Sequence, residues 1–269
     1  MKLKILLSLS LIFTVFTTAA AATPEIHCKH FIYGYPLGGP DSNDLIIRDL
    51  YALSSNDTTK FADWVAYRLD SAAITGKSIK KRKWKADPWL EENETLEPDD
   101  YKKANKKLKT DRGHQAPLAS FKGYRNFYEA NYLSNITPQK AALNQGPWKK
   151  LEEAVRRLVK EVGEVYVMTG PIYNDAGSLK LPEADETHII PSAYWKIIVI
   201  DNKQHKPYVV AYIFDQNTPR RDKVMKHLTT VDEVENQTGF DFFRLLDDKT
   251  EDIIENKKNS ALAKKYFNK

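Results

Sequence analysis

Short segments in which apolar residues run together or alternate with polar ones indicate where the chain forms strands. Four such segments are rich in aromatic and β-branched residues and are predicted as strands: 61–69, 165–169, 193–200 and 207–214. Gly170-Pro171 follows the second segment and predicts its end. Residues 201–206 join the last two segments, which predicts an antiparallel hairpin.

Residues 147–162 carry the strongest helical pattern in the chain. Proline suits the first position of a helix and glycine suits its C-terminal cap, so Pro147 and Gly163 predict the two ends. Four apolar residues at helical spacing form one stripe: Leu151, Val155, Leu158 and Val162. The pattern predicts an amphipathic helix that packs this stripe against the core.

Three further helices are predicted: a short one over 99–107, one opened by the capping box at 230–233, and one over 251–266. The capping box places Thr230 before the helix and Glu233 three residues later, and Gly239 predicts the end of that helix. Strands and helices do not alternate, so the predicted class is α+β, with an antiparallel central sheet flanked by helices. Residues 23–269 contain no linker and are predicted as a single domain.

The first 22 residues differ from the rest of the chain. Lys2 and Lys4 precede an apolar run over 5–16, and small residues follow over 17–22. This order is typical of a Sec signal peptide, which predicts a secreted or periplasmic protein with no membrane attachment after cleavage. A permanent membrane anchor is disfavoured because the run is too short to cross a bilayer.

Composition adds two constraints. The chain is 42% hydrophobic and 11% aromatic, which excludes a disordered protein. Cys28 is the one cysteine, so its alternatives are a free thiol and an intermolecular bridge. Charge is uneven, because residues 77–125 hold 14 Lys and Arg against 8 Asp and Glu. This excess fits a solvated loop and a cationic rim for a polyanion equally well.

The segment Thr110-Asp111-Arg112-Gly113-His114 concentrates residues that carry chemistry. An arginine can bind phosphate through two hydrogen bonds, and glycine lets the backbone approach a neighbour closely. A histidine can act as a general base near neutral pH. The alternative is a polar turn ahead of the apolar residues 116–118.

A second group of polar residues lies at the start of the predicted helix. Asn144 precedes it, and Glu152 and Arg156 are four residues apart on one of its faces. An amide oxygen is a suitable ligand for Mg²⁺, and Glu152 is then placed to hold one of the waters that the ion retains. The alternatives are that Asn144 caps the turn and that Glu152 and Arg156 form an ordinary surface pair.

Taken together, four pieces of sequence resemble the DNA/RNA non-specific endonuclease family, the ββα-metal nucleases that include secreted bacterial nucleases and mitochondrial endonuclease G. These pieces are 111–114 (DRGH), 131–139 (NYLSNITPQ), 143–148 (LNQGPW) and Glu152. The resemblance runs from about Tyr67 to Asp215 and extends through 231–243. It implies a ββα-metal nuclease site and hydrolysis of DNA and RNA to 5′-phosphorylated products, with Mg²⁺, or Mn²⁺ in its place, as the cofactor.

The resemblance also implies roles for single residues. His114 matches the general base, Asn144 the direct protein ligand of Mg²⁺, and Glu152 the carboxylate that orients metal-bound water. The residues that match substrate-contacting positions are Arg82, Arg112, Asn135 and Arg156, and Asn131 matches an asparagine near the site. The three arginines also belong to the predicted catalytic set. Many secreted relatives carry disulfides, and this chain departs from them because Cys28 has no internal partner.

Two other functions remain open at this point. One is an exported nucleic-acid-binding protein without catalysis, which the set Arg82, His114, Asn144 and Glu152 disfavours because binding alone requires neither a base nor a metal ligand. The other is a phosphodiesterase for small substrates on the same scaffold. A homodimer is also left open. If the pKa of His114 is ordinary, activity is expected to fall below about pH 6.5.

Overall fold

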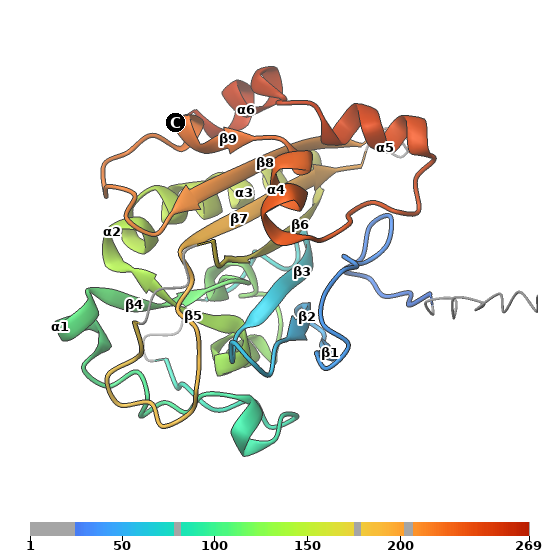
Figure 1. Cartoon of the computed structure of the whole chain (residues 1–269). Helices are drawn as coiled ribbons and strands as arrows, with labels where there is room; N and C mark the ends of the chain where they lie inside the picture. Colours follow the sequence, from blue (N-terminus) through green and yellow to red (C-terminus); the bar gives the residue numbers. More distant parts are fainter. Residues whose placement is uncertain (1–24, 78–81, 175–178, 202–206, 269) are drawn as a thin grey trace, which may run out of the picture.

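The computed structural model describes residues 25–77, 82–174, 179–201 and 207–268, so the predicted signal peptide at 1–22 lies outside the described residues. Its centre is a seven-stranded sheet with the order β1-β2-β3-β6-β7-β8-β9, in which all neighbours are antiparallel (Figure 1). The strands of this sheet are β1 (Asp44–Ile47), β2 (Ala52–Ser55), β3 (Ala62–Asp70), β6 (Glu164–Ile172), β7 (Ala193–Ile200), β8 (Tyr208–Asp215) and β9 (Leu228–Thr229).

A second, two-stranded sheet pairs β4 (Thr110–His114) with β5 (Ile136–Lys140). The α-helices are α1 (Ala104–Leu108), α2 (Ala141–Leu143), α3 (Lys149–Val162), α4 (Val231–Thr238), α5 (Asp248–Glu255) and α6 (Ser260–Phe267). The predicted class, α+β with an antiparallel central sheet flanked by helices, is confirmed.

The predicted strands agree with β3, β6, β7 and β8, and β7 and β8 pair as the predicted hairpin, although its connection at 202–206 is outside the described residues. One boundary was wrong, because β6 continues through Gly170 and Pro171 to Ile172. Its pairing with β3 ends at Thr169, so the missing N–H of Pro171 costs no hydrogen bond on that side. Gly170 is needed where β6 touches β3, since a Cβ there would lie 2.2 Å from the Asp63 carbonyl oxygen.

The helix predicted over 147–162 is part of a longer, interrupted segment. The helical path starts at α2, passes through a wide π-type turn at Asn144–Trp148, and continues as α3. Gly146 breaks the regular backbone angles in that turn, and a Cβ there would lie 2.5 Å from the Arg220 carbonyl oxygen. Gly163 ends α3 as predicted. Val162 was wrongly placed in the stripe, because it is 36% exposed and Val159 is buried instead.

The remaining helices agree with the sequence in part. Thr230 caps α4 by accepting a hydrogen bond from the Glu233 amide at 3.1 Å, and Gly239 ends the helix with a positive φ. The helix predicted over 99–107 is α-helical only over α1. The helix predicted over 251–266 is instead two helices, α5 and α6, because the Asn259 side chain caps a new start by accepting from the Leu262 amide.

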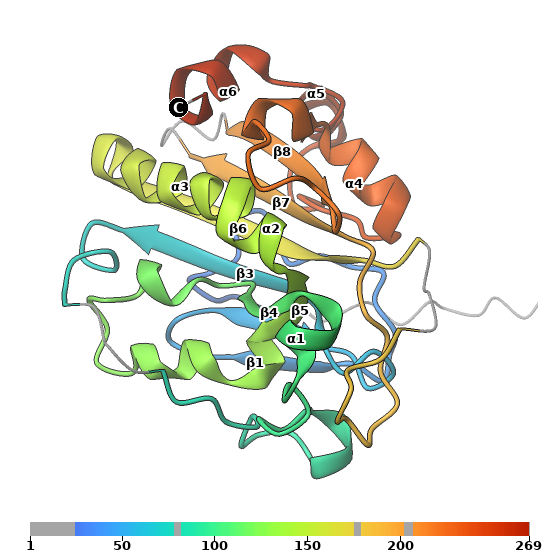
Figure 2. The same cartoon turned by 90° about the vertical axis from the view of Figure 1, so that its left-hand side faces the viewer.

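Helices cover both faces of the large sheet, with α3 along one face and α4 on the other (Figure 2). The α3 face buries residues such as Val155, Leu158 and Tyr212, and α6 adds Phe267 to the same cluster. The α4 face buries Trp195 and Phe242. None of the described helices is long and apolar enough to cross a membrane.

Candidate active site

A cleft of about 650 Å³ opens beside the small sheet and the start of α3. Six of the predicted site residues line it: Arg82, Arg112, His114, Asn144, Glu152 and Arg156. Trp84, Tyr101 and Lys149 contribute to its walls. The cleft is therefore lined by four cationic side chains and two carboxylates, those of Asp111 and Glu152, which favours an anionic ligand.

The small sheet explains how residues far apart in the sequence meet. The pairing of β4 with β5 places Thr110 opposite Lys140 and His114 opposite Ile136, and the chain then enters the helical segment that carries Asn144. The segment 110–114 is thus a strand, and its interpretation as a polar turn is wrong. Gly113 is required by this packing, because a Cβ there would lie 2.6 Å from the Cβ of Gln139.

His114 is held in an orientation suited to a general base. Its Nε2 lies 3.0 Å from the Oδ1 of Asn131, and its ring packs against Trp84 with the centroids 5.3 Å apart. Because an amide oxygen can only accept, Nε2 carries the proton and Nδ1 is the acceptor. Burial lowers the pKa of His114 to about 4, the bond to Asn131 opposes that shift, and the charge of Arg82 adds to it. The imidazole is therefore neutral at neutral pH.

Asn144 is oriented by a neighbour that the sequence did not single out for this role. Its Nδ2 donates to Asp111 Oδ2 at 3.0 Å, and Gln145 Nε2 donates to the same oxygen at 2.7 Å. Asn105 donates to the other carboxylate oxygen at 3.0 Å. Asp111 therefore orients the amide group of Asn144 and leaves its carbonyl oxygen available to a cation. That oxygen, with the carboxylate of Glu152 in the same cleft, fits a hard divalent cation such as Mg²⁺.

Glu152 and Arg156 project from α3 into the cleft, so they are not an ordinary exposed surface pair. Burial raises the pKa of Glu152, whereas the positive charges of Lys196 and Arg156 and the side chain of Trp148 lower it. Arg156 Nη1 lies 3.4 Å from Ser120 Oγ, its hydrogen-bond acceptor. Arg156 thus stands at the rim, where it can meet a phosphate.

The two other arginines, Arg112 and Arg82, differ in how strongly contacts within the protein hold their side chains. Arg112 Nη2 donates to the Pro98 carbonyl oxygen at 2.7 Å, and its guanidinium lies over the rings of Trp84 and Tyr101 at 5.5 and 5.1 Å. Arg82 is exposed, with its guanidinium 5.9 Å from the Trp84 ring centroid. Arg82 is therefore the freer of the two to follow a phosphate.

The structure corrects the expectation that Asn135 contacts substrate. Its side chain is fully buried and does not line the cleft. Oδ1 accepts from the Ala116 amide at 2.8 Å, and Nδ2 donates to the carbonyl oxygens of Ala116 and Ala130 at 2.9 Å. Asn135 thus ties the segment that follows His114 to the segment that carries Asn131.

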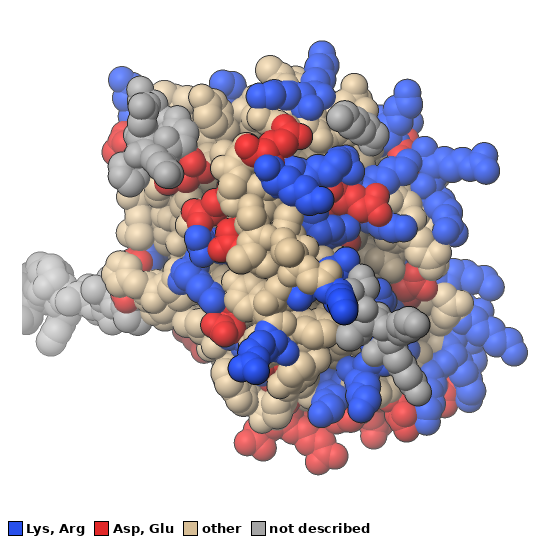
Figure 3. All heavy atoms as spheres, turned by 180° about the vertical axis from the view of Figure 1, so that it is seen from behind, with Lys and Arg blue, Asp and Glu red and all other residues tan. Residues whose placement is uncertain are grey.

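Basic residues extend beyond the cleft. A neighbouring depression shares Ala119 and Arg156 with it and is lined by Lys122, Arg157 and Lys160. In Figure 3, Lys and Arg side chains gather on the right-hand side, which is the side that carries α1 and α2 in Figure 1. The sequence predicted an excess of basic residues only over 77–125. It did not indicate that Arg157 and Lys160 of α3 add to the same surface. Lys80 and Lys81 of the predicted cationic rim lie outside the described residues.

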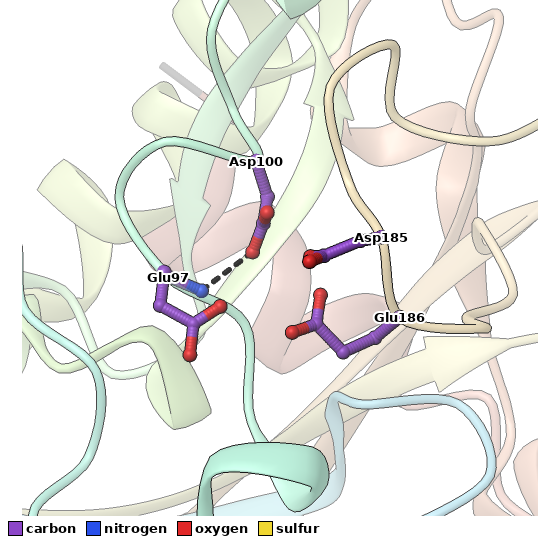
Figure 4. A group of neighbouring side chains, drawn as sticks. All are labelled: Glu97, Asp100, Asp185 and Glu186. Atoms are coloured by element: carbon purple, nitrogen blue, oxygen red, sulfur yellow. Dashed lines mark hydrogen bonds between the residues drawn. The ribbon is translucent and has the colours of Figure 1, made fainter.

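Carboxylates gather at a separate place. Figure 4 shows the side chains of Glu97, Asp100, Asp185 and Glu186 pointing toward one another. Burial and the nearby Glu186 and Asp100 raise the pKa of Glu97 to about 7. These four residues do not line the cleft, so the cluster is separate from the site that holds His114 and Asn144.

Comparison with known proteins agrees with the geometry of the cleft. Residues 29–249 match the DNA/RNA non-specific endonuclease family. A nuclease of Serratia marcescens is 44% identical over 252 residues, 93% of each chain, and a nuclease of Nostoc sp. is 28% identical over 85% of each.

Among solved structures, that of the EndoG/EndoGI complex contains a chain with a TM-score of 0.68 to this one. The two are 26% identical, and the match covers 81% of this chain and 91% of that chain. The protein thus belongs to the DNA/RNA non-specific endonuclease family and is a metal-dependent endonuclease, as the resemblance implied.

Proposed function

We propose that this endonuclease cleaves DNA and RNA internally with Mg²⁺ and leaves 5′-phosphates on its products. The observation that carries the proposal is the pairing, in one cationic cleft, of a neutral, hydrogen-bonded His114 with the oriented amide oxygen of Asn144. We also propose that residues 23–269 act as a single domain. The composition of residues 1–22 supports export to the periplasm or the medium.

In this proposal His114 activates the nucleophile. Nδ1 accepts a proton from the attacking water, while Asn131 holds the ring through Nε2. The hydrogen bond to the Asn131 oxygen then stabilises the positive charge that forms on the imidazole. A general base of this kind contributes about 10²–10⁴-fold to the rate.

The other residues of the cleft address the phosphate and its charge. Asn144 would hold Mg²⁺ and Glu152 would hold waters that the ion retains, and bound Mg²⁺ would supply positive charge that offsets the charge on the leaving 3′-oxygen. Arg82 and Arg156 donate to the non-bridging phosphate oxygens as charge develops on them. Arg112 contributes its fixed positive charge from the wall of the cleft.

This arrangement needs nothing from the sugar or the base of the substrate. The nucleophile is an external water, so a 2′-hydroxyl is not required, and the cationic groups all address phosphate. The same reasoning favours both single and double strands. The basic depression beside the cleft supports a long polyanion over a small phosphodiester, because a small substrate would not reach Lys122 and Lys160.

The decisive experiment incubates purified protein with supercoiled plasmid and with a matched RNA, in Mg²⁺, Mn²⁺ or chelator. We expect both polymers to be cut internally. The 5′ ends of the products should accept a phosphate label only after phosphatase treatment, because an existing 5′-phosphate blocks labelling at that end. Bis(p-nitrophenyl) phosphate serves as the small-substrate comparison. Full activity in chelator, a strict need for a 2′-hydroxyl, or preference for the small ester would contradict the proposal.

A further inference from the structure

Lys196 is a fully buried lysine at the centre of the large sheet. It is 0% exposed and lies in the middle of β7, opposite Thr169 of β6 and Tyr212 of β8. Side chains alternate between the faces of a strand, so Lys196 points to the same face as Tyr194 and Ile198, both of which pack in the α3 cluster. The lysine therefore lies beneath the helix that carries Glu152.

The surroundings of the ammonium are mostly aromatic. Nζ lies 4.5 Å from the centroid of the Trp148 ring and 5.8 Å from that of Tyr67, and it donates to the Tyr67 hydroxyl at 3.5 Å. Cation–π contacts and one long hydrogen bond recover part of the hydration that the ammonium loses. A buried charge remains costly unless an opposite charge lies near it.

Glu152 is the opposite charge that acts on Lys196. It follows Trp148 by one helical turn, and its field opposes the burial that lowers the pKa of Lys196 to about 8. In return, Lys196 is the strongest of the groups that lower the pKa of Glu152. No carboxylate of the described residues comes within 4.0 Å of Nζ, so the attraction acts across a gap and not through a direct ion pair.

We propose that Lys196 is a positioning residue for the reaction: its buried ammonium, which packs against Trp148 one helical turn before Glu152, attracts the Glu152 carboxylate and so favours the position in which that carboxylate would hold the waters of a bound metal. This inference rests on the proposed function, because it assigns Lys196 a role through Glu152. Packing alone does not explain the lysine. The positions on the same side of β7, Tyr194, Ile198 and Ile200, all belong to the hydrophobic cluster, and a methionine would fill a similar volume without a charge.

A double-mutant cycle separates this role from simple packing. We would prepare Lys196→Met, Glu152→Gln and the double variant. The first measurement is the affinity for Mn²⁺ by calorimetry without nucleic acid. The second is the Mg²⁺ concentration that gives half-maximal cleavage. Lys196→Met should weaken both by about 10–100-fold when Glu152 is present, as expected for a residue that orients a metal site. In the Glu152→Gln background the further change should be less than about threefold.

Ile198→Ala is the matched control, because it lies two residues along the same strand and faces the same cluster. It should lower the urea midpoint of unfolding and leave Mn²⁺ affinity unchanged. The inference would be overturned, with the proposed function left standing, if Lys196→Met lowered the metal affinity equally in both backgrounds or left the Mn²⁺ affinity unchanged. If Glu152→Gln keeps full activity and Mn²⁺ affinity, the proposed role of Glu152 fails and the inference fails with it.

The cycle stays informative if Lys196→Met folds poorly. Removing Lys196 alone leaves the Glu152 carboxylate without the opposite charge beneath it, whereas removing both charges relieves that cost. The double variant should therefore be more stable in urea than Lys196→Met. A double variant that is no more stable than the single one would show that Lys196 does not act through Glu152.

Discussion

Strand β7 presents Trp195 and Ile197 to one face of the large sheet and Lys196 to the other. On the α4 face, Trp195 meets Phe242 with the ring centroids 5.2 Å apart, and both side chains are fully buried. On the α3 face, the same strand places an ammonium beneath Trp148 and near Glu152.

This difference shows how one strand serves two purposes. The α4 face gains stability from apolar burial, and a polar group there would reduce that stability. The α3 face carries the cost of a buried charge beneath the helix whose Glu152 and Arg156 line the cleft. Substitutions on the two faces should therefore separate stability from turnover.

The largest effect should come from the cleft side of the comparison. His114→Ala should lower kcat by at least about 10²–10⁴-fold, because the water loses its general base. Nucleic-acid binding should stay nearly intact, since the arginines remain. Cleavage assays and binding measured in chelator check the two parts. If the variant keeps more than a tenth of the wild-type activity, His114 is not the general base.

Next in size is a change on the α4 face. Phe242→Ala should lower the free energy of unfolding by about 3–5 kcal/mol, because it leaves a cavity against Trp195. The kcat of the folded protein should stay within about twofold. Urea unfolding and cleavage at low temperature test this, with the milder Ile197→Val as a graded companion. A large drop in the kcat of folded Phe242→Ala would contradict the division between the faces.

Asn144→Ala should raise the Mg²⁺ requirement and lower the maximal rate, because no other protein oxygen is proposed to take its place. Asp111→Asn is a subtler version, since it weakens the hold on the Asn144 amide and keeps the coordinating oxygen. It should cost about 10–100-fold in metal affinity, the usual effect of removing an orienting partner. Mg²⁺ titrations compare the two. Unchanged curves for both variants would place the ion elsewhere.

The pH profile should be broader than an ordinary histidine predicts. Burial lowers the pKa of His114 to about 4, so the base stays neutral and competent well below pH 6.5. We expect kcat/KM to hold more than half its maximum at about pH 5.5. This corrects the expectation of a fall near 6.5. An acid limb between pH 5 and 7 that disappears in Glu152→Gln would instead belong to Glu152, whose pKa burial raises.

The smallest effect should come from the surface beside the cleft. Lys122→Ala and Lys160→Ala should weaken binding to all sequences alike. The log–log salt slope on duplex DNA should fall by about 0.9 for each phosphate that the variant no longer neutralises. Exposed Lys83 provides a comparison on the other basic segment. Binding isotherms at several salt concentrations measure this. Weaker binding confined to particular sequences would indicate base reading.

Much of this arrangement could be predicted from local pattern. The β7–β8 hairpin, the end of α3 at Gly163 and the capping of α4 by Thr230 follow from features within a few residues. The candidate residues also followed from spacing and resemblance, and the structure brings six of them into one cleft. Boundaries failed where a distant element decided them. The end of β6 depends on its pairing with β7, which continues to Ile172 after the pairing with β3 has stopped at Thr169. The break between α5 and α6 is the exception, because it follows from a local cap at Asn259.

By itself, the sequence determined the class of the fold, the family and the kinds of groups that the site requires, because periodicity and motif spacing are local properties of the chain. Only the tertiary structure decided which partner each group meets. In the folded protein Asn135 is buried behind the site and the Asn144 amide donates a hydrogen bond to Asp111. Lys196 lies beneath the helix that carries Glu152. These outcomes depend on burial and on contacts between residues tens of positions apart, and such contacts and the pKa shifts they cause exist only once the chain has packed.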